Sequence, residues 1–164
     1  MDLVRLQPNT FTSITAAISI DAVWEVASDP TLLANFSTEL QAVRILGSGA
    51  IDLGAQFEGD QLRGERRWTT ISTVTGFQPE AFFEWTVGDL DHPVSKWRFL
   101  LDTHALGTTL THQVVLCGGP SPLTDFITEN PDQADATVHE RLDTLRGRMA
   151  ETVAGLIDLA AERR

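Results

Sequence analysis

The 164-residue sequence contains one cysteine, Cys117, one lysine, Lys96, and no tyrosine. A single cysteine excludes an intramolecular disulfide and any site that needs paired cysteines. Basic residues are few as well, since 12 Lys and Arg stand against 23 Asp and Glu, a net charge of −11. This balance argues against nucleic acid and anionic membranes as partners, because clustered Lys and Arg bind both.

Long apolar runs are also absent. The longest runs span a few residues, too short to cross a membrane, and the N-terminus lacks the apolar stretch behind positive charge that marks a signal peptide. No linker or repeat divides the chain, so we expect one cytoplasmic domain, residues 1–164. We find no nucleotide-binding or hydrolase motif and no metal-ligand spacing, and therefore expect no cofactor and no metal site.

The sequence does contain many short strand-like segments. Residues 11–20 predict a strand, and Asp21 is then the expected N-cap of a short helix, which Asp29-Pro30 separates from a second. Residues 40–117 alternate β-branched and aromatic runs with Gly, Pro and Asp turns, which predicts six more strands. The connections are too short for parallel crossovers, so we expect these strands to be antiparallel.

A long amphipathic helix is expected at the C-terminus. Asn130-Pro131 supplies an N-cap and a first-turn proline, and at roughly 30 residues the helix would cross the whole sheet. Gly147 and Gly155 each cost up to about 1 kcal/mol there. Room for a ligand beneath Gly147, or crowding against another helix, would explain them. The order of elements predicts an α+β fold, with one sheet face against the helix. Its apolar stripe is Val138, Leu142, Leu145, Met149, Val153, Leu156 and Ala160.

Tight turns predict which strand residues lie opposite one another and face the helix. Glu84 and Thr86 fall on the other face and are expected in solvent. The expected pairs are Gln61 with Trp68, Gly59 with Thr70 and Phe57 with Ser72; Val74 with Trp85 and Ser72 with Val87; and Leu101 with His112, Phe99 with Val114 and Trp97 with Leu116.

The inward face mixes large aromatic side chains with a few polar ones. A buried polar group without a partner costs free energy, so an ordinary core would not need them. Aromatic walls with a few orienting polar groups are typical of a binding cavity. We therefore predict a cavity between sheet and helix. The polar inward residues are Gln61, Thr70, Ser72 and His112.

The segment GAQFEGDQLRGERRWTTISTVTGFQPEAFFEWTV, followed by SKWRFLL and GTTLTHQV, resembles the SRPBCC or START-like superfamily, and within it the polyketide cyclase/dehydrase group. The resemblance implies a helix-grip fold like that of the birch-pollen allergen, a seven-stranded antiparallel sheet around a long C-terminal helix, with two short helices after the first strand. It also implies a deep hydrophobic cavity. The chain departs from the group at Gln61, where an asparagine is usual, and in its lack of the tyrosine that cyclases use.

Several expected site residues have two interpretations. His112 is either a core histidine bonded to Thr70, Ser72 or Gln61, or a ligand contact that moves protons. Arg63 and Arg66 either receive an anionic head group at the cavity mouth or are solvated beside nearby acids. The expected catalytic residues are His112 and Arg66. The expected ligand contacts are Phe36, Phe57, Gln61, Trp68, Thr70, Ser72, Trp85, Trp97, Phe99, His112, Leu142, Leu145 and Met149.

Three functions remain open at this point. The first is binding of a small hydrophobic molecule, a lipid or a polyketide-like aromatic, by a monomer or homodimer without membrane insertion. The second is a cyclase/dehydrase-like lyase, in which His112 moves protons and Arg66 stabilises an enolate. The third is a protein-interaction module like the chaperone-associated members of the superfamily, with a filled core and no ligand.

Overall fold

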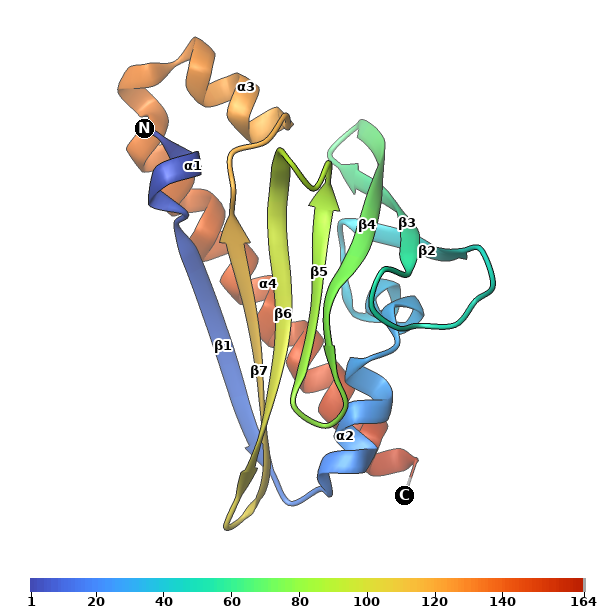
Figure 1. Ribbon diagram of the computed structural model, residues 1–164. Helices are drawn as coiled ribbons and strands as arrows, with labels where there is room; N and C mark the ends of the chain where they lie inside the picture. Colours follow the sequence, from blue (N-terminus) through green and yellow to red (C-terminus); the bar gives the residue numbers. More distant parts are fainter. Residues whose placement is uncertain (164) are drawn as a thin grey trace.

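The computed structural model describes residues 1–163 and shows a curved sheet with one long helix across its concave side (Figure 1). The sheet has seven strands in the order β1-β7-β6-β5-β4-β3-β2, and every neighbouring pair is antiparallel. This confirms the predicted α+β helix-grip fold. The elements are α1 (Leu3–Leu6), β1 (Asn9–Ala16), α2 (Ile20–Ala27), η1 (Pro30–Phe36), β2 (Leu40–Leu46), β3 (Gln56–Arg63), β4 (Arg66–Gln78), β5 (Phe82–Gly88), β6 (Pro93–His104), β7 (Gly107–Leu116), α3 (Pro122–Glu129), η2 (Pro131–Gln133) and α4 (Ala134–Glu162).

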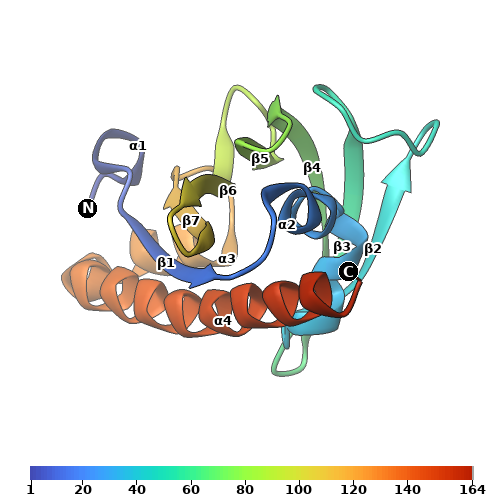
Figure 2. The same ribbon diagram turned by 90° about the horizontal axis from the view of Figure 1, so that it is seen from below.

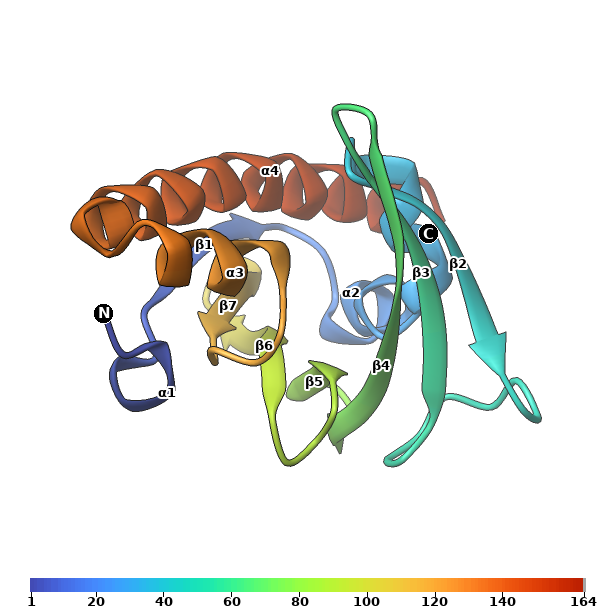
Figure 3. The ribbon, with the colours of Figure 1, turned by 90° about the horizontal axis from the view of Figure 1, so that it is seen from above.

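Helix α4 closes the open side of the sheet. Figure 2 shows it running beneath β1, and it also packs against β7, α2 and η1. Seen from above, α3 lies beside the start of α4, and β2, β3 and β4 form the opposite wall (Figure 3). The space between sheet and helix is therefore bounded by elements from both ends of the chain.

Two clusters of buried apolar side chains hold α4 to the sheet. The C-terminal half of α4 contributes Val153 and Leu156 to a cluster with α2 and the central strands. The N-terminal half contributes Leu145 and Met149 to a second cluster with the ends of β7 and α3. The expected stripe is buried along its length except at Leu142, which is half-buried. The core between sheet and helix therefore consists of two clusters, one against each half of α4.

The helix boundaries differ slightly from the expected ones. Strand β1 ends at Ala16, and α2 begins one residue before Asp21, after the N-cap Ser19. The second short helix is a 3₁₀ helix, η1, whose first turn is capped by Asp29. The long helix begins at Ala134 and not at Pro131, because Pro131–Gln133 form the separate 3₁₀ turn η2 first.

The strand registers test the predicted pairs directly. The pairs between β3 and β4 and between β4 and β5 are confirmed. The β6–β7 pairs were wrong by two residues, because His104 pairs with Gly107 and the turn residues are therefore Ala105 and Leu106. A shift of two keeps every side chain on its own face, so the inward face is unchanged. Its consequence is local: His112 pairs with Phe99 instead of Leu101.

The outer face of the central strands is less exposed than expected. Glu84 and Thr86 are 8% and 1% exposed. Thr75 donates a hydrogen bond to Glu84, at 2.7 Å, and Arg98 from β6 forms an ion pair with the same carboxylate. Thr86 is 3.0 Å from the Thr75 hydroxyl. Cross-strand polar contacts therefore cover these two side chains on the face that was predicted to meet solvent.

Candidate functional site

A cavity of about 130 Å³ lies between the concave face of the sheet and α4. Its lining joins both core clusters, since Phe57 and Trp85 belong to one and Leu145 and Met149 to the other. Most of the expected ligand contacts meet here. They are Phe57, Gln61, Thr70, Ser72, Trp85, Trp97, His112, Leu145 and Met149.

A second cavity of about 140 Å³ adjoins the first and extends toward α3 and the start of the chain. Trp68 and Arg63, both expected at the site, line this second cavity. The two cavities share the side chains that separate them. The shared residues are Glu39, Gln61, Thr70, Val87, Trp97 and Leu145. Together the cavities form one divided cleft.

Four expected site residues line neither cavity. Phe36 packs on Gly155 of α4, with a ring carbon 2.2 Å from where a Cβ would stand, so it is a helix-packing residue and it explains that glycine. Phe99 is fully buried beneath His112, and Leu142 packs against the second core cluster. Arg66 is exposed at the β3–β4 turn, with its guanidinium carbon 5.9 Å from the centre of the Trp68 ring.

The cavity wall contains a rigid aromatic layer. The rings of Trp85 and Trp97 are stacked with an interplanar angle of 5° and centres 6.3 Å apart. Trp97 donates its indole N–H to the Ser95 hydroxyl at 3.0 Å, which fixes the ring. Phe57 meets Trp85 edge-on, with ring centres 6.1 Å apart. This layer offers a flat apolar surface on which the Trp97 N–H is already paired.

His112 is buried behind this wall with a defined protonation. Its ring stacks on Phe99, with centres 4.1 Å apart, and Nδ1 is 2.9 Å from the backbone oxygen of Arg98. A carbonyl oxygen can only accept, so Nδ1 carries the proton. Burial lowers the pKa of His112 to about 4, so the ring is neutral near pH 7. The nitrogen available to a ligand is therefore Nε2, a hydrogen-bond acceptor.

The bonding partner of His112 differs from the three side chains that were expected. Thr70 instead donates a long hydrogen bond, 3.4 Å, to the backbone oxygen of Gly59. Within residues 1–163, no side-chain hydrogen bond is found for Gln61 or Ser72. Both line the first cavity, and Ser72 is 3% exposed. Their polar groups are thus free to meet a bound molecule.

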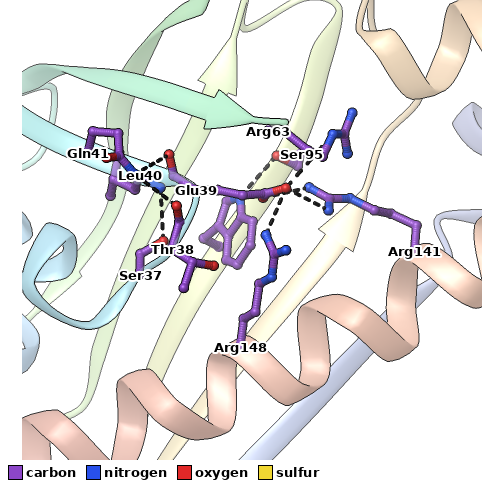
Figure 4. Close-up of polar contacts among 10 residues, drawn as sticks. Ser37, Thr38, Glu39, Leu40, Gln41, Arg63, Ser95, Arg141 and Arg148 are labelled. Atoms are coloured by element: carbon purple, nitrogen blue, oxygen red, sulfur yellow. Dashed lines mark hydrogen bonds and ion pairs between the residues drawn. The ribbon is translucent and has the colours of Figure 1, made fainter. Parts of the chain in front are cut away.

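A charged cluster at the edge of the cleft was missed from the sequence (Figure 4). Glu39, just before β2, is buried and pairs with Arg141 of α4 through two hydrogen bonds of 3.1 and 3.0 Å. Arg148 lies 2.8 Å from the same carboxylate, and Arg63 of β3 lies 3.9 Å from it. We call these four residues the Glu39 cluster.

Within the Glu39 cluster, only the two arginines of α4 follow a spacing that can be recognised in the sequence. Arg141 and Arg148 stand four residues before and three residues after Leu145, a spacing that places all three on one helix face. Glu39 carries no such signal, because its contact spans 102 residues of chain. Burial raises the pKa of Glu39, but the hydrogen bonds of Arg141 and the positive charges of Arg141 and Arg148 lower it overall, which keeps the carboxylate ionised.

Across residues 1–163, no group of three or more His, Cys, Asp or Glu side chains is arranged to hold a metal ion. In the same part of the chain, none of the helices combines the length and the apolar character needed to span a membrane.

Comparison with known proteins adds a family. A model of the family described as polyketide cyclase / dehydrase and lipid transport matches residues 9–154. A search of curated proteins finds no match. Among solved structures, the polyketide cyclase-like protein Cgl2372 from Corynebacterium glutamicum is 25% identical, with a TM-score of 0.62 over 90% of this chain and 88% of that chain.

More distant structures share the fold. The di-domain ARO/CYC protein StfQ of the steffimycin biosynthetic pathway is 12% identical, with a TM-score of 0.71 over 94% of this chain, which spans 51% of StfQ. Ara h 8.0201 is 11% identical, with a TM-score of 0.58 over 92% of this chain and 98% of that chain. The family model covers most of the sequence, and the neighbours match its architecture. The chain therefore belongs to the polyketide cyclase / dehydrase and lipid transport family, within the SRPBCC superfamily.

Proposed function

We propose that this protein binds a small, largely apolar molecule containing a flat ring, in the cleft between the sheet and α4. The observation that carries the proposal is the first cavity, whose wall holds stacked Trp85 and Trp97 and where Gln61 and Ser72 have no side-chain hydrogen bond within residues 1–163. An apolar cavity of about 150 Å³ holds one benzene ring. Each cavity therefore suits one ring. A two-ring ligand occupies both cavities once the side chains that separate them move.

The polar groups in the cavity define what a ligand presents to them. Neutral His112 offers Nε2 as an acceptor, so it favours a hydroxyl or N–H donor on the ligand. Gln61 and Ser72 offer both donors and acceptors. The preferred ligand is then an aromatic molecule with at least one phenol-like hydroxyl.

The same features favour binding over catalysis. A general base works best with a pKa near the operating pH, whereas the pKa of His112 is about 4. Arg66, the expected partner for an enolate, is exposed and lines neither cavity. The open space beside Trp85 also disfavours the interaction module, whose core would be filled. We therefore place the cyclase/dehydrase and interaction functions behind ligand binding.

A titration with 2-naphthol tests the proposal. Ser72→Leu puts an apolar side chain into the cavity, whereas Thr73→Leu makes the same kind of change on the opposite face of β4. We expect calorimetry to show 2-naphthol binding to the wild type and to Thr73→Leu, and at least about tenfold weaker binding to Ser72→Leu, because the added side chain occupies the ligand's space.

The proposal fails if neither 2-naphthol nor naphthalene binds the wild type at their solubility limits. It also fails if Ser72→Leu, still cooperatively folded, binds 2-naphthol as well as the wild type does. Native mass spectrometry of the freshly purified protein, followed by extraction, would identify a retained molecule directly.

A further inference from the structure

The Glu39 cluster carries more positive than negative charge. Three guanidinium groups, of Arg63, Arg141 and Arg148, surround one carboxylate. Among residues 1–163, Glu39 is the acidic side chain that lines the two cavities. The whole protein has a net charge of −11, so this local excess runs against the bulk balance. A concentration of positive charge at a cleft indicates an anionic partner.

The hydrogen bonds of the cluster are unequally shared. Arg141 engages both oxygens of Glu39 in a paired arrangement. Arg148 Nη1 is buried 2.8 Å from a Glu39 oxygen, yet it makes no well-aligned hydrogen bond within the described residues. Arg63 stands 3.9 Å away, beyond hydrogen-bonding distance. One carboxylate thus satisfies Arg141 and leaves the donors of Arg148 and Arg63 under-used.

The surroundings of Arg63 indicate the same shortage of negative charge. Burial lowers its pKa first, and the positive charge of Arg141 lowers it further, with smaller contributions from Arg66 and Arg148. Glu39 opposes these effects, but the pKa of Arg63 remains below its ordinary value. A second anion beside Arg63 would relieve this repulsion.

The cluster also lies at the correct place for a ligand. Glu39 and Arg148 line the first cavity, and Glu39, Arg63 and Arg141 line the second. Figure 4 shows the guanidinium groups of Arg141 and Arg148 directed at Glu39 from α4, with Arg63 of β3 beside them. A molecule that fills the cleft therefore ends near this cluster, whichever half holds its ring.

We propose that the natural ligand carries a carboxylate, which Arg148 and Arg63 bind where the two cavities meet. Glu39 competes with this carboxylate for the same guanidinium groups. The planar guanidinium fork binds carboxylates through two parallel hydrogen bonds, which selects this anion. The inference rests on the proposed function and adds a ligand class to it: an aromatic acid instead of a neutral apolar molecule.

Two matched probes test the inference. The anion 2-naphthoate and the neutral 2-naphthamide share ring and shape, so their difference in affinity reports the carboxylate. We expect the wild type to bind 2-naphthoate about tenfold or more tighter than 2-naphthamide, the size of one charge-assisted hydrogen bond. Arg148→Met, which keeps an unbranched apolar stem and removes the guanidinium group, should abolish this preference.

Substitution of the competitor gives the sharper result. Glu39→Gln removes the internal anion with almost no change of shape, and we expect it to tighten 2-naphthoate binding by about fivefold or more. Easier opening of the cleft would help both probes alike, so the deciding result is the ratio of 2-naphthoate to 2-naphthamide affinity, which should rise by about fivefold or more. Glu58→Gln is the matched control, because Glu58 pairs with Arg44 at 3.0 Å on the outer face of the sheet. That variant should bind both probes as the wild type does.

The outcomes separate this inference from the proposed function. Equal affinity of the wild type for both probes overturns the carboxylate ligand and leaves binding of neutral molecules intact. An unchanged ratio of the two affinities in Glu39→Gln overturns the role of Glu39 as competitor. Failure of both probes and of 2-naphthol overturns the proposed function itself. If Arg148→Met does not fold, Glu39→Gln still decides the question, because glutamine can keep a neutral hydrogen bond to Arg141.

Discussion

Buried polar side chains link the chemistry of single residues to the stability of this protein. His112 lies neutral among three aromatic rings and donates its one N–H to a backbone oxygen. Ser72 and Gln61 face the same cavity without a side-chain hydrogen bond in the described chain. These residues are unfavourable in an empty cavity and become favourable once a ligand supplies partners. The empty site therefore lowers the stability of the fold, and a bound ligand restores it.

The buried histidine gives a pH prediction. Unfolded His112 titrates near 6.5, whereas the folded ring has a pKa of about 4. Between these values the unfolded state binds more protons, so the free energy of unfolding falls as pH decreases from 6.5 to 4, by up to about 3 kcal/mol. Urea denaturation from pH 7.5 to 4 measures this loss.

The variant His112→Gln provides the control for that measurement. Glutamine can still donate to the Arg98 carbonyl but does not titrate, so its stability should change less between pH 6.5 and 5. Glu39 contributes in the same direction at lower pH, because its lowered pKa stabilises the fold above the ordinary carboxyl pKa and this stability is lost on acidification. Identical pH profiles for both proteins would contradict the prediction.

Residue-level prediction from the sequence succeeded where a periodic rule applied. Strand alternation placed Ser72, Trp85 and His112 on one face, and all three line the cavity. It failed for Glu39, whose partners on α4 are distant in the chain and follow no spacing rule. It also missed the His112 partner, a backbone oxygen on the neighbouring strand. Every residue has such an oxygen, so residue types cannot predict which one is bound.

At the level of elements, the two glycines of α4, Gly147 and Gly155, form a matched pair. Both glycines of α4 reduce helix propensity equally, yet their surroundings differ. Gly147 is exposed and a Cβ there would meet nothing within 4 Å, whereas Gly155 lies under the Phe36 ring. We expect Gly147→Ala to raise the free energy of unfolding by up to about 1 kcal/mol. Gly155→Ala should lower it by about 1–3 kcal/mol, because the methyl group displaces the ring.

Thermal and urea denaturation of the two variants measure these opposite effects. Phe36→Leu makes room at the contact, so adding Gly155→Ala in that background should cost less than in the wild type. Equal changes in both backgrounds would show that Phe36 does not set the requirement for glycine at position 155.

Elements themselves were predictable because their signals are local. Asp29-Pro30 marked the break between α2 and η1, and the Asp29 carboxylate accepts a hydrogen bond from the Thr31 N–H at 3.0 Å. The β6–β7 register was misplaced because both candidate turns have two residues, and the exact turn depends on backbone geometry at Gly107. There φ is +134°, and a Cβ would stand 2.0 Å from the Ala16 oxygen. That contact with β1 is tertiary information.

For the whole molecule, the order of elements was sufficient to predict a sheet around a helix. Whether the space between them is open depends on a few side-chain volumes, which no periodic pattern contains. The two cavities, of about 130 and 140 Å³, are small beside the pockets of about 300–1,000 Å³ that hold drug-sized ligands. A ligand larger than one ring therefore requires the cleft to widen, and we expect β2 and β3 to separate from α4, because Glu39 and Arg63 on that side meet the arginines of α4.

Opening at this edge is testable by hydrogen exchange. Glu39 ties the start of β2 to α4 through Arg141, and its backbone oxygen accepts the Leu62 N–H at 2.8 Å. Weakening the tie in Glu39→Gln should speed exchange of the Leu62 amide about tenfold, because local opening becomes easier by about 1.4 kcal/mol. The Leu101 amide of β6, which donates to the Ala81 oxygen at 2.9 Å beside the start of β5, should exchange as in the wild type. If both amides accelerate together, the substitution has lowered global stability instead, and the β2 edge is not where the cleft opens.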